Sequence, residues 1–240
     1  MIPKTIHYCW FGGKPLPQEA VKCLNSWKQH MPDFEIIQWD ESNYDISQYA
    51  YTKEMYEKKK WAFLTDFVRL DIVYKYGGIY FDVDVEVLRS FEPLLKYDGF
   101  AGMESQALVA TGLGFGAVAK HPMLSEFMTS YLEPERNPDN GDIKIITCPI
   151  LQTNILRKHG FASENKIQNI GGLEILTTEY LAPYDIYSGK MNITPNTYSI
   201  HHYSASWTSP WQRLKIIVKP FFYRTHLYDF MKKMVKFLGL

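Results

Sequence analysis

The 240-residue sequence is short of cysteine, of net charge and of long hydrophobic runs, and each shortage excludes a class of protein. Cys9, Cys23 and Cys148 are odd in number and lack CxxC spacing, which excludes a disulfide scaffold and indicates reduced thiols. Twenty-six basic residues balance 26 acidic ones, so no excess charge is available for binding nucleic acid. Because the sequence shows neither a signal-peptide core nor a run of membrane-spanning length, we expect a soluble, cytoplasmic protein.

Hydrophobic residues make up 46% of the chain and aromatic residues 15%, enough to fold around a core without staples. Apolar residues alternate over 2–10, recur at helical spacing over 17–31 and alternate again over 34–39. This strand-helix-strand order predicts an α/β fold with a mostly parallel central sheet. We expect one domain over 1–210 and a basic amphipathic segment over 211–240. The first turn lacks both the GxGxxG and the GxxxxGK[ST] pattern, so neither a dinucleotide fold nor a P-loop is supported.

The middle and last thirds of the chain continue the alternation of helices and strands. Helical spacing predicts helices over 51–76, 122–131 and 151–159. Strands are expected over 79–88, over 100–103, near 175 and over 198–202. Three glycines within 112–116 predict a flexible loop or a tight strand junction there.

The predicted strand 79–88 gathers acidic residues on one face. Period-two geometry puts Asp82, Asp84 and Glu86 on the same face as Tyr80. Carboxylates this close need a counter-charge, and the nearest cation in sequence, Arg89, lies beyond the strand. A Mg²⁺ or Mn²⁺ ion that also binds a substrate diphosphate would supply one. An edge strand with its acidic face in water explains the pattern equally well.

Two further places in the chain carry candidate site residues. Asp66 and Arg69 are three apart on an otherwise apolar helix, so we expect them to be partly buried. The alternative is an exposed ion pair of little consequence. His201 and His202 are adjacent on a predicted strand and point to opposite faces, so at most one can serve the same site.

Four ordered blocks resemble the DXD-containing sugar transferases of glycosyltransferase family 32. They are residues 2–13, Asp66-x-x-Arg69, residues 76–84 and residues 201–207, and they span roughly 1–210. The resemblance implies a Rossmann-like GT-A fold, a nucleotide-diphosphate sugar as donor, a Mn²⁺ or Mg²⁺ ion and retention of anomeric configuration. The family includes yeast-type mannosyltransferases and bacterial capsular polysaccharide and lipopolysaccharide enzymes.

The resemblance also implies roles for individual residues. Trp10 is similar to the aromatic residue that stacks on the donor base, although a core tryptophan at a strand end is the alternative. Asp66 and Arg69 match the pair that binds donor sugar hydroxyls, and Tyr80 matches the tyrosine two residues before the DXD motif. The remaining matches are Asp82 and Asp84 for donor ribose and metal, His202 and Ser206 for metal and diphosphate, and Trp207 for the leaving phosphate.

One block departs from the family pattern. Residues 148–151 resemble a Gly-Pro-x-x-Leu block in which Cys148 replaces the glycine, so its role stays open.

The function implied is metal-dependent, retaining transfer of a hexose to a hydroxyl of a glycan acceptor in surface polysaccharide synthesis. A UDP-sugar is the favoured donor and GDP-mannose is the alternative. Since no carboxylate stands out as a nucleophile, we favour front-face attack by the acceptor, with a donor phosphate oxygen taking the proton. A haloacid-dehalogenase-like phosphatase using Asp82 as nucleophile is a second interpretation, because residues 81–85 also satisfy DxDx[TV]. A non-catalytic carbohydrate-binding protein is a third.

The last 30 residues combine positive charge with apolar residues. Residues 211–240 hold seven Lys and Arg residues against Asp229 alone. This pattern is typical of peripheral contact with an anionic membrane, where a lipid-linked glycan acceptor would be found. A C-terminal helix docked on the domain explains it as well.

Overall fold

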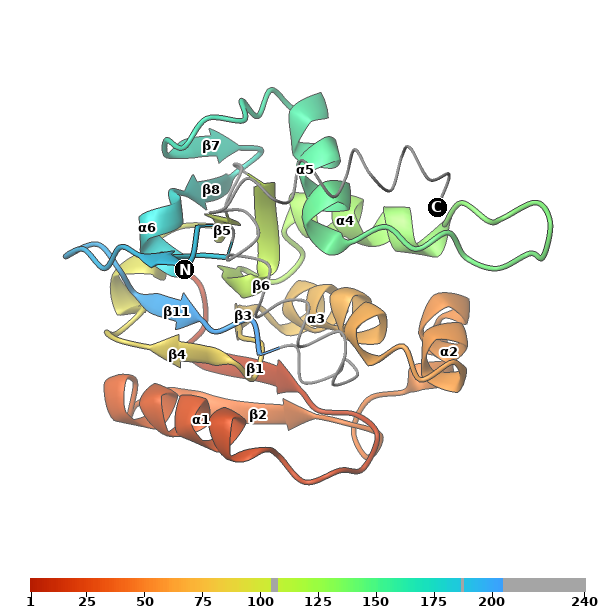
Figure 1. The fold of residues 1–240 in the computed structure, drawn as a ribbon, viewed down its shortest axis with the longest axis horizontal. Helices are drawn as coiled ribbons and strands as arrows, with labels where there is room; N and C mark the ends of the chain where they lie inside the picture. Colours follow the sequence, from red (N-terminus) through yellow and green to blue (C-terminus); the bar gives the residue numbers. More distant parts are fainter. Residues whose placement is uncertain (105–107, 187, 205–240) are drawn as a thin grey trace.

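The computed structural model describes residues 1–104, 108–186 and 188–204. These residues form an α/β fold around a seven-stranded sheet of order β2-β1-β3-β6-β5-β8-β7 (Figure 1). The predicted segment 211–240 and the candidate residues Ser206 and Trp207 lie outside the described residues. Within the described ranges, none of the helices combines the length and the apolar character needed to cross a bilayer.

The chain opens with the strand-helix-strand unit that the sequence predicts. Strand β1 (Thr5–Cys9) pairs in parallel with β2 (Glu35–Trp39), and helix α1 (Gln18–His30) connects them. Helix α1 turns its apolar stripe inward, and the indole N–H of Trp27 donates to the Val85 carbonyl at 2.7 Å. This bond ties α1 to the segment that carries the acidic residues.

The predicted helix over 51–76 is two helices, α2 (Ala50–Glu57) and α3 (Trp61–Tyr76). They are separated at Lys59, whose φ of +53° lies outside the helical region. Helix α3 is buried along most of its length, including Asp66, Arg69 and Asp71. It ends at Gly77, which has a φ of +69° and begins the sharp turn into the next strand.

The acidic strand expected over 79–88 is split in two. Strand β3 (Gly78–Tyr80) lies in the large sheet between β1 and β6, whereas β4 (Val85–Val87) pairs with β11 (Ser199–His201) in a separate two-stranded sheet. A turn between them is closed by the Val85 N–H, which donates to the Asp82 carbonyl at 3.0 Å. Both aspartates of the DXD motif therefore sit in a turn where the chain leaves the large sheet.

The glycine-rich segment 112–116 is part of a strand and not a loop. Strand β6 (Leu108–Ala117) pairs antiparallel with β3 and with β5 (Gly99–Glu104). The glycines allow close packing, since a Cβ at Gly116 would lie 2.7 Å from the Phe100 ring. The sheet is completed by β8 (Leu173–Leu176), parallel to β5, and β7 (Gln168–Ile170), antiparallel to β8.

The sheet is mixed and not mostly parallel as expected. The pairs β1–β2, β1–β3 and β5–β8 are parallel, and the other three neighbouring pairs are antiparallel. The reason is that β6 runs back between β3 and β5 without a crossover helix of its own.

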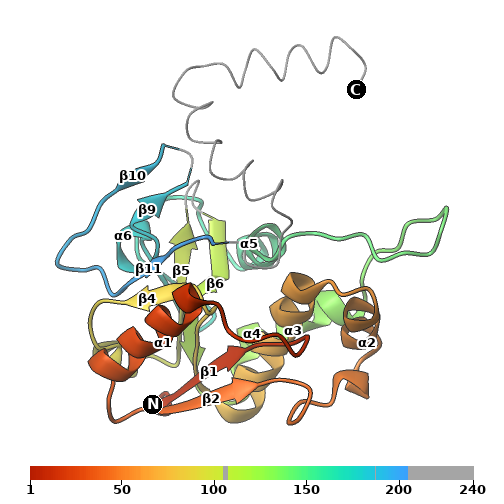
Figure 2. The same ribbon diagram turned by 60° about the horizontal axis from the view of Figure 1, so that its bottom comes forward.

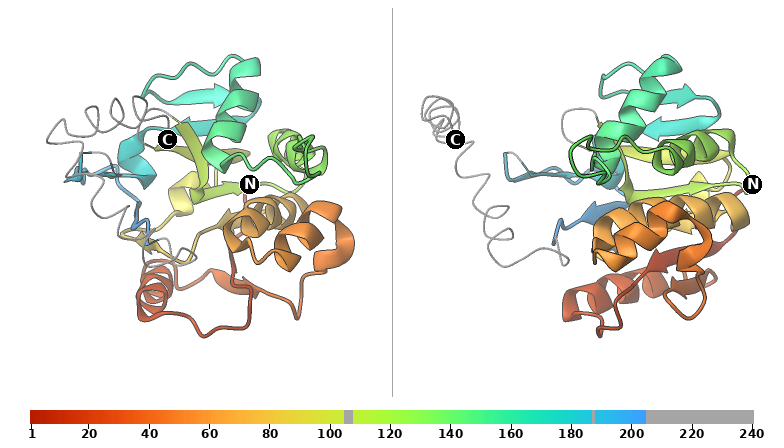
Figure 3. Two further views of the ribbon diagram at one scale, coloured as in Figure 1. Left: turned by 45° about the vertical axis from the view of Figure 1, so that its right-hand side comes forward. Right: turned by 90° about the vertical axis from the view of Figure 1, so that its right-hand side faces the viewer.

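Helices and short elements cover the sheet (Figures 2 and 3). The remaining helices are α4 (Pro122–Leu132), α5 (Cys148–Lys158), α6 (Thr178–Leu181) and the 3-10 turns η1 (Ile46–Gln48) and η2 (Glu92–Leu94). A small hairpin is formed by β9 (Tyr184–Asp185) and β10 (Lys190–Met191). Because strand neighbours point to opposite faces, Tyr8 joins a cluster built on α1, whereas Cys9 joins the one built on α3 and α4.

Candidate active site

Three segments far apart in sequence converge at the end of β3. Helix α3 contributes Asp66 and Arg69, the turn after β3 contributes Asp82 and Asp84, and the end of β11 contributes His201. Strand β11 lies beside β4 (Figure 1), and their antiparallel register places His201 opposite Val85, directly after the acidic turn. Pairing of these strands therefore brings the histidine to the aspartates.

Arg69 is the counter-charge of this site. Its guanidinium lies 2.8 Å from Asp66 Oδ1 and 3.3 Å from Asp82 Oδ2, and its Nε–H donates to the Thr65 carbonyl at 3.0 Å. The Arg69 side chain is only 4% exposed and lies over the Tyr80 ring, 5.2 Å from the centroid. The sequence pointed to Arg89 as the nearest cation, but the fold brings Arg69 to the aspartates from the preceding helix.

Burial changes the acidity of both carboxyl groups bonded to Arg69. Desolvation raises the pKa of Asp66 to about 6, although the neighbouring Arg69 acts to lower it. Burial also raises the pKa of Asp82 above its usual range, again against the effect of Arg69. The Tyr80 hydroxyl donates to Asp82 Oδ1 at 3.0 Å, so each oxygen of Asp82 has a donor. The pair Asp66–Arg69 is thus buried, as expected, and connected to the DXD motif.

Asp84 has a different environment. Its Oδ2 accepts two hydrogen bonds from Ser204, from the backbone N–H at 2.9 Å and the hydroxyl at 3.0 Å. Its Oδ1 lies 3.3 Å from His201 Nε2. Burial acts to raise the pKa of Asp84, but His201 and Ser204 together hold it well below the usual range. Burial acts to lower the pKa of His201, and the Asp84 carboxylate more than offsets this and raises it.

The structure corrects the choice between the two histidines. His202 was expected beside the aspartates, but its Nε2 lies 2.8 Å from Glu86 Oε2, and both of these side chains are more than 40% exposed. His201 takes the place beside Asp84 because successive residues of β11 and its extension point to opposite sides. Of the expected metal-binding set, Asp82 and Asp84 lie together, and His201 replaces His202.

Asp82, Asp84 and His201 fit a divalent cation. One donor atom from each can be chosen so that all three lie within 4.8 Å of one another. Two carboxylate oxygens and an imidazole nitrogen suit Mn²⁺, and the oxygens suit Mg²⁺. Strand β6 passes close by: a Cβ at Gly112 would lie 2.8 Å from Asp82 Oδ2 and 2.9 Å from Arg69 Nη1. The fold leaves room for the carboxylates there only because residue 112 is glycine.

Trp10 lies at the end of β1, half-buried against the cluster built on α1. Its indole N–H donates to the Lys14 carbonyl at 2.5 Å. This bond fixes the ring relative to the glycine-rich turn that follows β1. Trp10 is partly buried and partly exposed, so this position is compatible both with stacking on the donor base and with a packing role at the end of the strand.

Sequence reasoning missed three residues of the site. Ser204 lies inside the block 201–207 and Gly112 inside the glycine-rich segment 112–116, but neither was assigned a role, and only the folded chain shows their contacts with Asp84 and Asp82. Cys148 begins α5, and its buried thiol acts to lower the pKa of Asp66, although desolvation raises that pKa overall. The block around Cys148 was noted, but without an assigned role.

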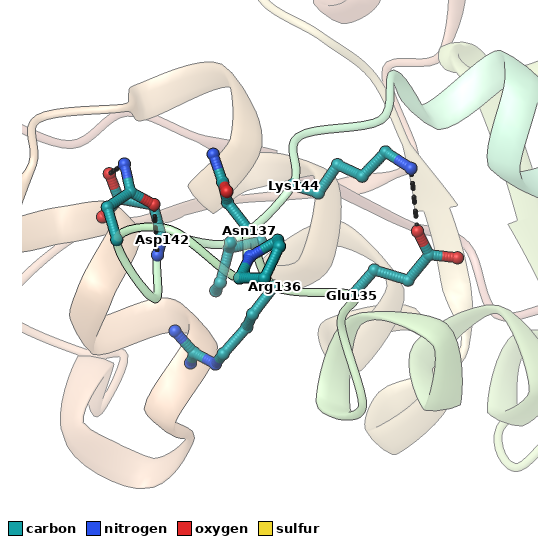
Figure 4. A pocket seen from close by; sticks show the side chains of 8 residues that line it. Glu135, Arg136, Asn137, Asp142 and Lys144 are labelled. Carbon is teal, nitrogen blue, oxygen red and sulfur yellow. Dashed lines mark hydrogen bonds and ion pairs between the residues drawn. The ribbon is translucent and has the colours of Figure 1, made fainter.

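The hairpin between α4 and α5 forms a hollow away from these residues (Figure 4). It is lined by residues of the hairpin itself, and Lys144 pairs with Glu135 at 2.9 Å. Asp142, which a phosphatase could have used with Asp139, instead pairs with Lys58 at 2.6 Å on the outside of the protein. The hairpin is therefore a surface turn and not part of the site built on Asp82 and Asp84.

Comparison with known proteins gives the following similarities. Residues 17–101 match the family described as "Glycosyltransferase sugar-binding region containing DXD motif". Inositol phosphoceramide mannosyltransferase 3 of Schizosaccharomyces pombe is 33% identical over 127 residues, which are 51% of this chain and 35% of that protein. Human alpha-1,4-N-acetylglucosaminyltransferase is 28% identical over 131 residues, 54% of this chain and 35% of that protein. The chain thus spans about a third of the length of these curated relatives.

Two solved structures are also similar. PaToxG glycosyltransferase has a TM-score of 0.49 at 16% identity, covering 65% of this chain and 68% of that one. The galactosyltransferase LgtC has a TM-score of 0.47 at 12% identity, covering 90% of this chain and 95% of that one.

Proposed function

We propose that this chain, whose residues 17–101 belong to the glycosyltransferase sugar-binding region containing the DXD motif, is a metal-dependent glycosyltransferase of the GT-A type. One observation carries the proposal. The two aspartates of that motif lie with His201 in a group that can hold a divalent cation, and Arg69 joins them to the buried Asp66. A family match without this geometry would leave the metal and donor sites unassigned.

The residues of the site have separate tasks in this proposal. Asp82, Asp84 and His201 would hold the ion, which neutralises negative charge on the departing diphosphate when bound. Asp66 and Arg69 would bind hydroxyl groups of the donor sugar, since a buried guanidinium and carboxylate offer donors and acceptors in fixed positions. Trp10 would stack on the base. Ser206 and Trp207 keep the role at the leaving phosphate that the sequence resemblance implies.

We propose retention of configuration by front-face attack. The acceptor hydroxyl would attack the anomeric carbon from the side of the leaving diphosphate, and a diphosphate oxygen would take its proton. The chain then needs chiefly to position donor and acceptor and to stabilise the leaving group. Trapping a covalent glycosyl-enzyme on an aspartate or glutamate would contradict this route.

For the donor and the acceptor we propose only chemical classes. The relatives' names refer to mannose and N-acetylglucosamine, which supports a hexose or a hexosamine as the transferred sugar. We favour a UDP-sugar, with GDP-mannose as the alternative donor, and a hydroxyl of a glycan acceptor in capsular polysaccharide or lipopolysaccharide synthesis. The composition of residues 211–240 supports contact with an anionic membrane, where a lipid-linked acceptor would lie.

The decisive experiment measures release of nucleoside diphosphate from UDP- and GDP-sugars with Mn²⁺, with Mg²⁺ and with a chelator. We expect release of nucleoside diphosphate only when both a sugar donor and a divalent ion are present. Asp84→Asn should reduce the rate of this release by at least about a hundredfold if the ion stabilises the leaving group. Glu86→Gln is the matched control, because Glu86 is the next carboxylate along the chain and faces the exposed His202. Equal turnover by wild type and Asp84→Asn would contradict the proposed site.

The phosphatase interpretation has less support. In that mechanism Asp82 attacks phosphorus, yet here its two oxygens accept from Tyr80 and Arg69. Donor-independent release of phosphate from an aryl phosphate would favour it. A purely carbohydrate-binding protein would bind sugar without an ion, and ion-independent binding with no turnover would favour that third interpretation.

A further inference from the structure

We propose that Ser204 is a positioning residue that fixes the orientation of the Asp84 carboxylate for the cation. The inference rests on the proposed function, because it concerns how this chain prepares one of the three groups that would hold the ion. Ser204 lies within the block 201–207, but the resemblance assigns it no role. Its importance follows from its contacts in the folded chain.

Ser204 directs both of its donors at one atom. The backbone N–H and the hydroxyl reach Asp84 Oδ2 at 2.9 and 3.0 Å. A third hydrogen bond holds Asp84 through its backbone, because the His202 N–H donates to the Asp84 carbonyl at 3.0 Å. Backbone and side chain of Asp84 are therefore both held by the segment 202–204.

These bonds leave the two oxygens of Asp84 in different states. Oδ2 is occupied by two donors from Ser204, whereas Oδ1 lies 3.3 Å from His201 Nε2. A carboxylate held in this way presents Oδ1 beside the imidazole nitrogen, which is the arrangement that one cation between them needs. Without the Ser204 hydroxyl only the backbone N–H still holds Oδ2, so the carboxylate rotates more freely, and part of the binding free energy of the ion is then needed to order it.

The backbone at Tyr203 makes this geometry available. Tyr203 has a φ of +49°, in the left-handed region that non-glycine residues rarely adopt. The reversal at Tyr203 lets His201 on one side and Ser204 on the other reach the same carboxylate. The Tyr203 ring packs edge-on against the His201 ring with centroids 4.2 Å apart, which holds the imidazole in place. An unfavourable backbone conformation is thus kept at the point where two side chains must converge.

The test is a titration of the full 240-residue chain with Mn²⁺ alone, followed by electron paramagnetic resonance of the free ion. Ser204→Ala should weaken Mn²⁺ binding by about tenfold, which is the lower end of the effect of removing a group that orients a metal ligand. Ser204→Thr keeps the hydroxyl and should bind as wild type does. In transfer assays the same weakening should appear in the Mn²⁺ concentration at half-maximal rate, with kcat at saturating ion changed much less.

Ser47 supplies a matched control elsewhere in the chain. Its N–H and its hydroxyl both donate to Asp45 Oδ1, at 2.9 and 2.6 Å, which is the same arrangement on a surface turn. Ser47→Ala removes the same kind of bond and should leave Mn²⁺ affinity unchanged. A general loss of stability would affect both variants, whereas a positioning role affects only Ser204→Ala.

The outcomes separate this inference from the proposed function. If Asp84→Asn loses Mn²⁺ binding but Ser204→Ala binds as wild type does, the positioning role is wrong and the metal site stands. If Asp84→Asn itself binds Mn²⁺ as wild type does, the proposed metal site fails. Should Ser204→Ala not fold, the equally sized pair Ser204→Thr and Ser204→Val decides, and equal affinity in that pair would overturn the inference.

Discussion

Gly112→Ala tests whether β6 limits the space around the Arg69–Asp82 bridge. The added Cβ would lie 2.8 Å from Asp82 Oδ2 and 2.9 Å from Arg69 Nη1, so ordinary contact returns only if both atoms move away by about half an ångström or β6 itself shifts. Arg69 cannot easily move, because it is almost fully buried and bonded to Asp66 at 2.8 Å and to the Thr65 carbonyl at 3.0 Å. We therefore expect Asp82 to be displaced and the bridge, already 3.3 Å long, to open.

The expected cost follows from overpacking in a confined site. Such substitutions lower stability by about 1–3 kcal/mol, and in a chain of this size each kcal/mol lowers the melting temperature by about 2–4 °C. Because Asp82 is one of the three groups proposed to bind the cation, Mn²⁺-dependent donor binding should fall as well. Thermal unfolding and a donor titration with Mn²⁺ measure the two effects separately.

Gly116→Ala is the matched control on the same strand. Its Cβ would lie 2.7 Å from the Phe100 ring, so it overpacks the apolar core without touching the charged residues. We expect it to lower the melting temperature while the folded protein binds donor normally. Wild-type melting and donor affinity in Gly112→Ala would refute the close approach of β6 to the site.

Three other predictions concern separate parts of the chain. The pKa of Asp66 is about 6 in the folded protein, above the usual 3.8. Protonation of Asp66 therefore stabilises the folded state in acid, and this part of the free energy of unfolding is lost as pH rises through 6. In urea denaturation, the free energy of unfolding of the wild type should fall by about 3 kcal/mol relative to that of Asp66→Asn between about pH 4 and pH 7. A difference between the two proteins that stays constant with pH would contradict a buried carboxyl with a raised pKa. Trp10→Ala should weaken nucleotide binding, measured by calorimetry, by about 1–3 kcal/mol, and Trp10→Phe should weaken it much less. If Trp10 has only a structural role, Trp10→Ala will change the melting temperature and leave nucleotide affinity unchanged. Replacing the lysines at 232, 233 and 236 with glutamate should abolish flotation with anionic vesicles, and unchanged flotation would exclude membrane contact through that segment.

Local patterns predicted the elements of the fold well. Alternation over 2–10 and helical spacing over 17–31 correspond to β1 and α1, because each signal depends only on which face of a regular element is buried. The buried pair Asp66–Arg69 was also predictable, since an apolar helix has little surface for an exposed ion pair. The DXD aspartates were singled out as carboxylates on one face of a strand, and they do lie together, but in the turn between β3 and β4.

Apart from the local break at Lys59 between α2 and α3, the failures concern contacts between distant segments. The split between β3 and β4 depends on β11, which pairs with β4 from more than 110 residues away, and no local pattern reports that pairing. The same pairing decides that His201 and not His202 faces Asp84. The segment 112–116 was predicted to be a flexible loop or a tight strand junction, because a glycine needed for close packing looks the same in sequence as one needed for flexibility.

The pairing of β4 with β11 sets an order of events during synthesis. Asp84 and Ser204 are 120 positions apart, and a ribosome adding about 5–20 residues each second needs on the order of ten seconds to pass from one to the other. Throughout that interval the nascent chain contains the residues of α3 and the acidic turn, but neither His201 nor Ser204. If the proposed cation site is correct, it can be completed only after nearly the whole described chain has been translated.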